Sequence, residues 1–362
     1  MKKEFVIFLL AACLLLGGCE LIPPRSTLPP QTEAPTPAAT EPATEPPTEA
    51  PTEPPYTNPL TGLTTQGPQQ KRIFAVSISN IPDAMPRIGV CMADIYLEMY
   101  VNDSIVRGLA LYTDPSFVPQ IGPVRSTRLM FNDLAMHYDL IVAHAGGSGY
   151  VLNDAAQNGV DGFNIDTWDS TDYSFRDKDR VSQGFGWEHV LFARGEGLEP
   201  KALADGINVE ADPDKDYLLR FLPDGTPAGG EDAAEIDLTL TYHESKKDCR
   251  FVYDADRSRY VYWQYGKEMT DGVTGEQETY ENVIVMFPTD IHIVNSGYQV
   301  ANFEDGGEGY FASGGKLIPI RWECDGARSP FRFLTADGQQ LFLTQGRTFI
   351  AITETGSPIT WT

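Results

Sequence analysis

The stretch FVPQIGPVRSTRLMFNDLAMHYDLIVAHAGGSGY, residues 117–150, sets the order of elements around which the folded part of the chain is built. Its start contains two prolines and a glycine, which predicts a loop. Apolar side chains then recur at helical spacing, which predicts a helix from about Leu129 to Tyr138 with Ser126 or Thr127 as its N-cap. The apolar run 139–144 predicts a short strand buried on both faces.

Basic side chains and glycines stand at the helix start and at the strand end of this stretch. If these two ends face the same way, two guanidiniums, an imidazole and glycine backbone converge, an arrangement that suits an anion. We therefore predict an anion- or ligand-binding site here, completed by a carboxylate from a neighbouring strand. The predicted residues are Arg125, Arg128, His144, Gly146, Gly147 and Asp94.

Each of these residues also fits a purely structural role. The arginines fit equally well in an internal ion pair, and the candidate partners are Asp94, Glu98 and Asp133. His144, at the end of an apolar strand, is typical of a hydrogen-bonded core histidine. The two glycines are also what a sharp turn needs.

Catalytic motifs leave the question of enzyme activity open. Asp94 and Glu98 are four residues apart on a predicted strand, which separates them by about 13 Å. Paired glycosidase carboxylates need roughly 5–9.5 Å, so these two do not form such a pair. Ser126 and Ser148 have His144 nearby in the sequence, but no Gly-x-Ser-x-Gly elbow is present. No Cys or His spacing indicates a metal site, and no cofactor is expected.

The N-terminus has the features of an exported lipoprotein. Two lysines precede an apolar run that is too short to span a bilayer as a mature helix. The run ends in Leu16-Gly17-Gly18-Cys19, which resembles the lipobox of bacterial lipoproteins, in which the cysteine is acylated with diacylglycerol and becomes the new N-terminus. We therefore predict a signal peptide and lipobox over 1–19, with lipidation at Cys19. Two acyl chains would anchor the protein stably on the extracytoplasmic face of the cell membrane.

Residues 20–55 consist largely of Pro, Thr, Glu and Ala, which predicts a disordered tether. In polyproline geometry, at about 3.1 Å per residue, this segment would reach on the order of 110 Å. The formal net charge of −24 argues against nucleic acid as a partner. Beyond the signal and lipobox, Cys91, Cys249 and Cys324 are predicted to be buried free thiols or to include one disulfide pair.

About 300 residues follow the tether, enough for two domains with cores of their own. Helix and strand patterns mixed in sequence predict an α+β fold with an N-terminal mixed α/β module over 56–225. From Ile236 onward the pattern is strands, which predicts a mostly antiparallel β module over 230–362, and the loop-rich segment 199–235 contains the predicted boundary. The predicted elements of the first module are strands at 74–79, 93–101 and 106–112, the helix and strand of the opening stretch, and helices at 151–157 and 187–193.

Six phrases, in order across the folded part, resemble the YerB-type lipoprotein family of Gram-positive envelope proteins. The phrases are Asn58-Pro-Leu-Thr-Gly, Ala93-Asp-Ile-Tyr-Leu-Glu, Ile121-Gly-Pro-Val-Arg-Ser-Thr-Arg128, Ala143-His-Ala-Gly-Gly-Ser148, Gly275-Glu through Val283-Ile-Val-Met-Phe287, and Gly314-Gly-Lys through Ile320-Arg-Trp322. The resemblance implies a two-module fold on a lipoprotein tether and no established activity.

A second, more distant similarity covers about sixty residues. Ala93-Asp94 followed by two strands, an arginine-bearing loop and a Gly-Gly turn is similar in order to the LytR–CpsA–Psr phosphotransferases. That family attaches glycopolymers to peptidoglycan and uses acidic and arginine residues around a pyrophosphate lipid. The chain departs from it by lacking the full arginine set and the transmembrane helix.

Three hypotheses follow. The first is an envelope lipoprotein that binds an anionic cell-wall component or a protein partner at the arginine site. The second is a phosphotransferase or hydrolase that acts on wall glycopolymers at the same residues. The third is a structural protein that uses its β module as a contact surface. The aromatic residues of that module are more typical of core and cross-strand pairs than of sugar platforms.

Overall fold

The computed structural model describes residues 56–102, 104–295 and 297–362. The predicted signal peptide, the lipobox with Cys19 and the tether lie outside the described residues. The described residues form one compact unit. Within the described part, no helix combines the length and the apolar character needed to cross a membrane.

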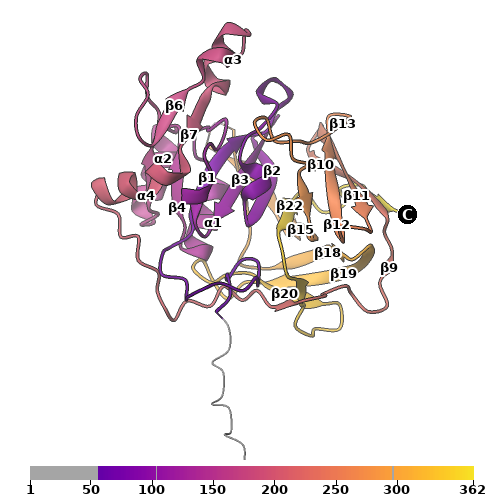
Figure 1. The fold of residues 1–362 in the computed structure, drawn as a ribbon. Helices are drawn as coiled ribbons and strands as arrows, with labels where there is room; N and C mark the ends of the chain where they lie inside the picture. The colour runs from indigo at the N-terminus through magenta and orange to yellow at the C-terminus, as the bar shows by residue number, and fades with distance from the viewer. Residues whose placement is uncertain (1–55, 103, 296) are drawn as a thin grey trace, which may run out of the picture. The chain divides into compact units, whose positions relative to one another are not determined.

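A large mixed sheet occupies the centre of this unit (Figure 1). Eleven strands of the described residues belong to it, and β9 (Glu231–Asp232) joins it by pairing with β19. The other strands, in spatial order, are β20 (Arg332–Thr335), β19 (Lys316–Glu323), β18 (Gly307–Ser313), β15 (Asn282–Pro288), β22 (Thr348–Ile352), β2 (Ile95–Asn102), β3 (Ile105–Tyr112), β1 (Phe74–Ser79), β4 (Ile141–His144) and β5 (Gly162–Asn164).

A second sheet packs on one face of the large one. Its strands are β13 (Lys267–Glu268), β12 (Arg259–Gln264), β11 (Ser245–Asp254), β10 (Glu235–Tyr242) and β23 (Ile359–Trp361), with β14 (Thr279–Tyr280) beside β12. Strand β10 alternates strictly between buried and half-buried positions. Such alternation is expected of an antiparallel strand that covers a core on one side only.

The helices and short elements complete the described chain. The helices are α1 (Leu129–Tyr138), α2 (Gly149–Gln157), α3 (Lys178–Ser182) and α4 (Gly195–Ala204), with 3-10 turns at η1 (Pro82–Ala84), η2 (Val90–Met92), η3 (Pro115–Phe117) and η4 (Trp187–His189). Three two-stranded sheets are formed by β6 (Ser174–Arg176) with β7 (Leu191–Ala193), β8 (Phe221–Leu222) with β21 (Leu343–Thr344), and β16 (Ile291–Val294) with β17 (Tyr298–Ala301).

The large sheet has a hydrophobic core on each face. On one face Tyr96 and Tyr100 of β2 pack with the inner residues of the six-stranded sheet. On the other face Leu97 and Met99 pack with the apolar side of α1. Strand β2 is therefore buried on both faces, although its alternating sequence is of the kind found in half-exposed strands. The covering by α1 on one side and by a sheet on the other explains this difference.

The predicted α+β class is confirmed, and α1 and β4 lie where the opening stretch predicts them. The predicted cap is wrong, because the N-cap of α1 is Arg128, which forms no side-chain capping bond. The predicted helix at 187–193 is also wrong. That segment is the turn η4 followed by β7, because Val190 to Ala193 are all buried and β7 pairs with β6.

Strands from both predicted modules share the large sheet. Strand β22, from the C-terminal part of the chain, pairs in parallel with β2 on one side and with β15 on the other. Figure 1 shows the two sheets side by side, with α1, α2 and α4 gathered near β4. The predicted boundary at 199–235 stays a prediction.

Candidate functional site

The candidate site forms where the loop before α1 crosses the ends of two strands. The Arg125 N–H donates to the Ser77 carbonyl of β1 (2.8 Å), and the Ala145 N–H donates to the Arg125 carbonyl (2.9 Å). The Thr127 N–H then donates to the Gly146 carbonyl (3.0 Å). These bonds fix the arginine-bearing loop between the ends of β1 and β4, so the predicted convergence of the loop with the glycine turn is present.

Sheet register explains why this edge collects polar groups. Strands β1, β4 and β5 run parallel, so their carboxyl ends meet at one edge, where ligands of open α/β sheets characteristically bind. His144 ends β4 and is level with Asn164 of β5. Strand β3 runs antiparallel to β1, and its Arg107 lies opposite Ser79 at the same edge.

Three guanidiniums meet at this edge. Arg107 is 2% exposed and donates to the Ser126 carbonyl. Arg128 donates to the same carbonyl (3.4 Å) and to that of Thr127 (2.8 Å). Arg125 donates to the carbonyl of Glu188 (3.2 Å). Among the described residues, none of these three arginines forms a direct ion pair with a carboxylate, and their N–H groups donate to carbonyl oxygens. The exposed Glu188 carboxylate acts on Arg125 without contacting it.

The electrostatics of the site reflect this lack of counter-charge. Burial lowers the pKa of Arg128 to about 10, and it also lowers the pKa of Arg125. For Arg107, burial and then the positive charges of Arg128 and Arg125 hold the pKa well below the usual range. A lowered pKa in a cationic group means that the fold disfavours its charged form. A bound anion would reverse that effect.

Two histidines belong to the same region, and burial lowers the pKa of each. His144 is 7% exposed, and burial lowers its pKa to about 4. His189 is 5% exposed, and burial followed by the charge of Arg125 lowers its pKa. Within the described part of the chain, the Nδ1 atoms of both rings and the Nε atom of Arg128 are buried without a hydrogen-bond partner that meets geometric criteria, although the Gly146 backbone acts on the His144 ring. Buried polar atoms are normally satisfied, so these three are open to a ligand or water.

The two glycines differ in their roles. Gly146 has a φ of 69°, a left-handed conformation that favours glycine, and its N–H donates to the Asn164 side chain (3.0 Å). That amide is therefore already used. A Cβ at Gly147 would lie 3.1 Å from the Leu152 side chain, so the turn is closely packed there. Within the described residues, the Gly147 N–H forms no hydrogen bond.

The carboxylates proposed as structural partners of the arginines bind elsewhere. Asp94 accepts hydrogen bonds from the Thr113 backbone (2.6 Å) and from Asn58 (3.1 Å), at the other end of the β2–β3 hairpin. The structure therefore does not bring Asp94 together with the arginines. Glu98 pairs with Lys247 on the opposite face of the sheet from α1. Burial raises the pKa of Asp133 to about 7, with Asp154 and then Glu304 as its charged neighbours.

Sequence reasoning missed Arg107, His189 and Tyr298. Arg107 lies within the strand pattern of β3, and only the register with Ser79 brings it to the site. Tyr298 of β17 is electrostatically coupled to Arg128 and stacks on Tyr150 of α2 at 5.9 Å. No local motif marks these residues, because each comes from a separate segment.

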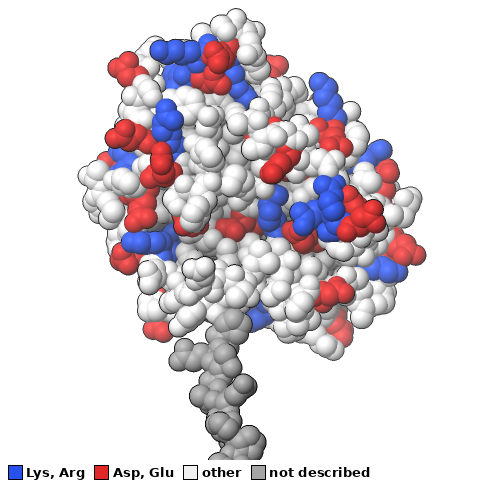
Figure 2. Space-filling view, in the orientation of Figure 1, with Lys and Arg blue, Asp and Glu red and all other residues white. Residues whose placement is uncertain are grey.

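The surface around these elements carries charges of both signs. Figure 2 shows acidic and basic side chains interspersed on one face of the molecule. Many are paired, as in Arg176 with Asp166 (2.5 Å) and Arg220 with Asp216 (2.6 Å). The arginine edge differs from this pattern, because its cations lack such partners.

Comparisons with known proteins identify relatives over most of the chain. Residues 60–208 match a family model described as "Protein of unknown function (DUF3048) N-terminal domain", and residues 238–350 match the corresponding C-terminal domain. The chain is 26% identical over 307 residues to the Bacillus subtilis (strain 168) protein named "Putative lipoprotein YerB", covering 81% of this chain and 85% of that protein. The crystal structure of YerB from Bacillus subtilis superposes with a TM-score of 0.72 at 23% identity, covering 84% of this chain and 99% of the other.

Proposed function

The chain belongs to the YerB-like family of two DUF3048 domains, and we propose that it is a lipid-anchored envelope protein that binds an anionic cell-wall component at the arginine edge. The observation that carries the proposal is the convergence of Arg107, Arg125 and Arg128 without a carboxylate partner among the described residues. The chain as a whole has a net charge of −24, so carboxylates are abundant elsewhere.

The chemistry of the edge favours a phosphate or carboxylate group. Guanidiniums bind both groups through paired N–H donors. The unpartnered Nδ1 of His144 and Nε of Arg128 offer further contacts to an anion. Neutral imidazole supplies one N–H donor, and it gains a second on protonation, which a bound anion would favour.

The proposed location follows from the N-terminal sequence. A lipidated Cys19 would hold the chain on the extracytoplasmic face of the cell membrane, and the relative's name supports a lipoprotein. The tether would then place the arginine edge at a distance from the membrane, within reach of wall polymers such as anionic glycopolymers.

A transferase acting on the same polymers is the alternative activity. An acidic group beside the arginines is part of the LytR–CpsA–Psr pattern, and Asp94 was the candidate for it. Because Asp94 is bonded to Asn58 and Thr113 instead, we propose binding in preference to transfer. The half-exposed carboxylate of Glu188 is the acidic side chain that acts electrostatically on Arg125.

The test measures anion binding by the full-length chain. We expect pyrophosphate and polyglycerol phosphate to bind in isothermal titration and to raise the melting temperature. At a ligand concentration of about 100 Kd the stabilisation would be about 2.7 kcal/mol. The double variant Arg125→Ala/Arg128→Ala should lose both effects, while its own melting temperature stays the same or rises.

A matched control removes two exposed cations elsewhere, in Lys246→Ala/Arg321→Ala. This variant should bind the anions as the parent does, because neither side chain belongs to the arginine edge. It loses the same amount of positive charge as Arg125→Ala/Arg128→Ala, so it controls for a general charge effect. Equal loss of binding in both double variants would show only a general charge effect. Collapse of the fold in Arg125→Ala/Arg128→Ala would show that the arginines are structural and would end the proposal.

A further inference from the structure

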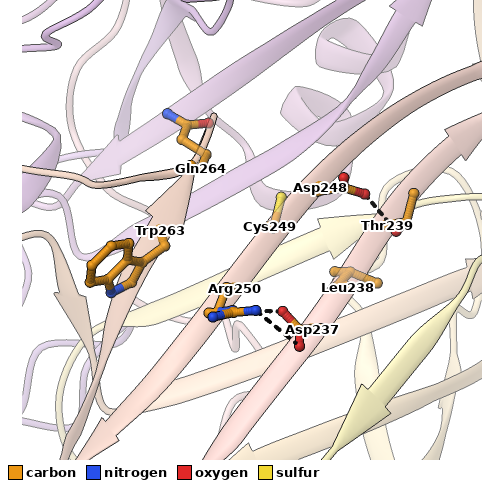
Figure 3. Close-up of a pocket in the computed structure, with 9 residues that line it drawn as sticks. Asp237, Leu238, Thr239, Asp248, Cys249, Arg250, Trp263 and Gln264 are labelled. Carbon is orange, nitrogen blue, oxygen red and sulfur yellow. Dashed lines mark hydrogen bonds and ion pairs between the residues drawn. The ribbon is translucent and has the colours of Figure 1, made fainter.

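The outer face of the six-stranded sheet contains a cavity that is separate from the arginine edge. It has a volume of about 490 Å³ and is lined by strands β10, β11 and β12 and by the turn at Gly266 (Figure 3). The side chains that project into it come from the face turned away from the core. They are Asp237, Thr239, Asp248, Arg250 and Trp263.

Trp263 is half-buried on this face, between neighbours that point inward. Tyr262 and Gln264, on either side of it in β12, are buried against the large sheet. Trp263 belongs to neither hydrophobic core, and within the described residues its indole N–H has no hydrogen-bond acceptor. A large aromatic ring with a free donor, set in a concavity, is typical of a binding surface and adds little to the core.

Polar pairs lie in register beside this ring. Arg250 is the cross-strand partner of both Trp263 and Asp237, so the three side chains form one row across the sheet. The Arg250 Nε donates to Asp237 (2.7 Å), and both side chains are 49% exposed. An ion pair this exposed contributes little to stability.

A second polar pair lies one row along the sheet, where the Thr239 hydroxyl donates to Asp248 (2.8 Å). Figure 3 shows the two pairs on neighbouring strands, with the Trp263 ring beside Arg250. Arg250 also pairs with Glu235 (3.3 Å). Carboxylate and guanidinium groups can each form more hydrogen bonds than these pairs use. The groove therefore presents an aromatic ring next to planar donors and acceptors.

The backbone edges of the strands around the groove are already paired, so a ligand would contact side chains. Strand β12 is covered at its outer edge by β13 and β14, and β10 is covered by β23. A ligand would therefore not add a strand to the ladder. Arg250 pairs with two carboxylates, Asp237 and Glu235, and Asp248 adds a further negative charge, so an anionic ligand is not favoured here.

We propose that this groove binds an uncharged polysaccharide, with one pyranose ring stacked on Trp263. The C–H groups of a pyranose face suit the electron-rich indole face, and its hydroxyls are both donors and acceptors, which matches Arg250, Asp237 and Asp248. The partner is a glycan strand of the wall type. The inference is independent of the arginine edge, since the residues that carry it come from other strands.

The test uses the full-length chain in a detergent without a sugar headgroup. Tetrasaccharides of N-acetylglucosamine and of glucose are titrated while tryptophan fluorescence and the heat of binding are recorded. We expect saturable binding and a fluorescence change that Trp263→Ala abolishes, with affinity reduced about tenfold or more. Trp168→Ala, at a residue 82% exposed elsewhere, should leave binding unchanged.

Further variants distinguish a loss of sugar binding from a loss of folding. Asp248→Asn and Thr239→Val change only the groove lining and should weaken binding several-fold at an unaltered melting temperature. Arg125→Ala/Arg128→Ala should bind both sugars as the parent does. Absence of saturable binding to either sugar and to peptidoglycan stripped of anionic polymers would overturn the proposal. So would sugar binding unaffected by Trp263→Ala, or Trp263-dependent binding of a sugar-free wall peptide alone.

Discussion

The Lys247 ammonium and the Glu98 carboxylate form an ion pair in which the two side chains are 3% and 0% exposed. Glu98 lies on β2 and Lys247 on β11, so the pair joins the two sheets through the core between them. Glu98 also accepts hydrogen bonds from Asn80 (2.6 Å) and Tyr262 (2.8 Å). The carboxylate is thus satisfied on every side by groups from both predicted modules.

The first prediction concerns this pair. Glu98→Gln keeps the shape of the side chain but leaves the Lys247 charge buried without a counter-charge. We expect a loss of about 3–5 kcal/mol in the free energy of unfolding, measured by urea denaturation. The double variant Glu98→Gln/Lys247→Met should recover part of that loss. A double variant no more stable than Glu98→Gln would mean that the hydrogen bonds of Glu98, and not the charge pair, hold the sheets.

The second prediction concerns the loop-rich segment. Limited proteolysis should cut first within residues 20–55 and next within 199–235. Because β22 pairs with both β2 and β15, we expect the two fragments from the second cut to co-elute in size-exclusion chromatography. Separation of the fragments without denaturant would show that the two modules are held together only by the peptide chain. Cuts inside 236–352 instead would contradict the predicted boundary.

Local patterns predicted much of this fold. Helix α1, strand β4 and strands β10, β11 and β12 lie where the local sequence pattern indicates, because each is specified by neighbouring residues. The helix predicted for 187–193 is wrong because the pairing of β7 with β6, which lies outside this segment, decides its conformation. The sharing of one sheet by both parts of the chain also depends on long-range pairing.

The candidate site was predictable only in part, for a similar reason. Arg125, Arg128 and the glycine turn belong to one continuous stretch, and backbone hydrogen bonds bring them together. Arg107 comes from another strand, and its place is fixed by register with Ser79. Asp94 is predicted as the carboxylate that accompanies the arginines, yet its bonds to Asn58 and Thr113 hold it at the other end of the β2–β3 hairpin.

The third prediction concerns the anchor. Cys19→Ala removes the thiol that lipidation requires, so we expect an unprocessed precursor or a released protein. Fractionation in detergent-free buffer and the mass of the chain measure both outcomes. Cys91→Ala, at a half-buried thiol whose pKa burial raises to about 12, is the matched control and should remain with the membrane. Processing of Cys19→Ala to mature size with retention in the membrane fraction would disprove the lipobox.

The fourth prediction concerns pH. Burial lowers the folded-state pKa of His144 to about 4, against an unfolded value near 6.5. Between pH 4 and pH 6.5, His144 is therefore protonated in the unfolded chain and neutral in the folded chain. Stability should fall as pH drops from about 6.5 to about 4, by about 3 kcal/mol from this residue. His144→Gln should flatten the slope of unfolding free energy against pH over this range.

Anion binding should be coupled to the same proton. An anion beside His144 favours the charged imidazole and raises its pKa, so pyrophosphate affinity should increase as pH falls from 7 to 5. The increase should be smaller in His144→Gln. An affinity that is independent of pH in the parent chain would place the anion away from this ring.

The last prediction concerns Arg107, the member of the site that sequence patterns did not reveal. Its folded-state pKa lies well below the usual range because of burial and the neighbouring charges of Arg128 and Arg125. The guanidinium is charged in the unfolded chain at pH 7, so holding it in this position costs stability. Arg107→Met keeps the apolar stem, removes the charge and sacrifices the bond to the Ser126 carbonyl. We expect the variant to be more stable by about 1–3 kcal/mol without ligand and to lose pyrophosphate-dependent stabilisation.

The control for Arg107 is Arg72, a second buried arginine with two carboxylate partners. Arg72 pairs with Asp139 (2.9 Å) and Asp161 (2.6 Å), so Arg72→Met removes a compensated charge and should lower the melting temperature. If Arg107→Met raises the melting temperature and Arg72→Met lowers it, then Arg107 serves a ligand and Arg72 serves the fold. If Arg107→Met destabilises the chain as Arg72→Met does, then Arg107 is structural, and the anion contacts are confined to Arg125 and Arg128.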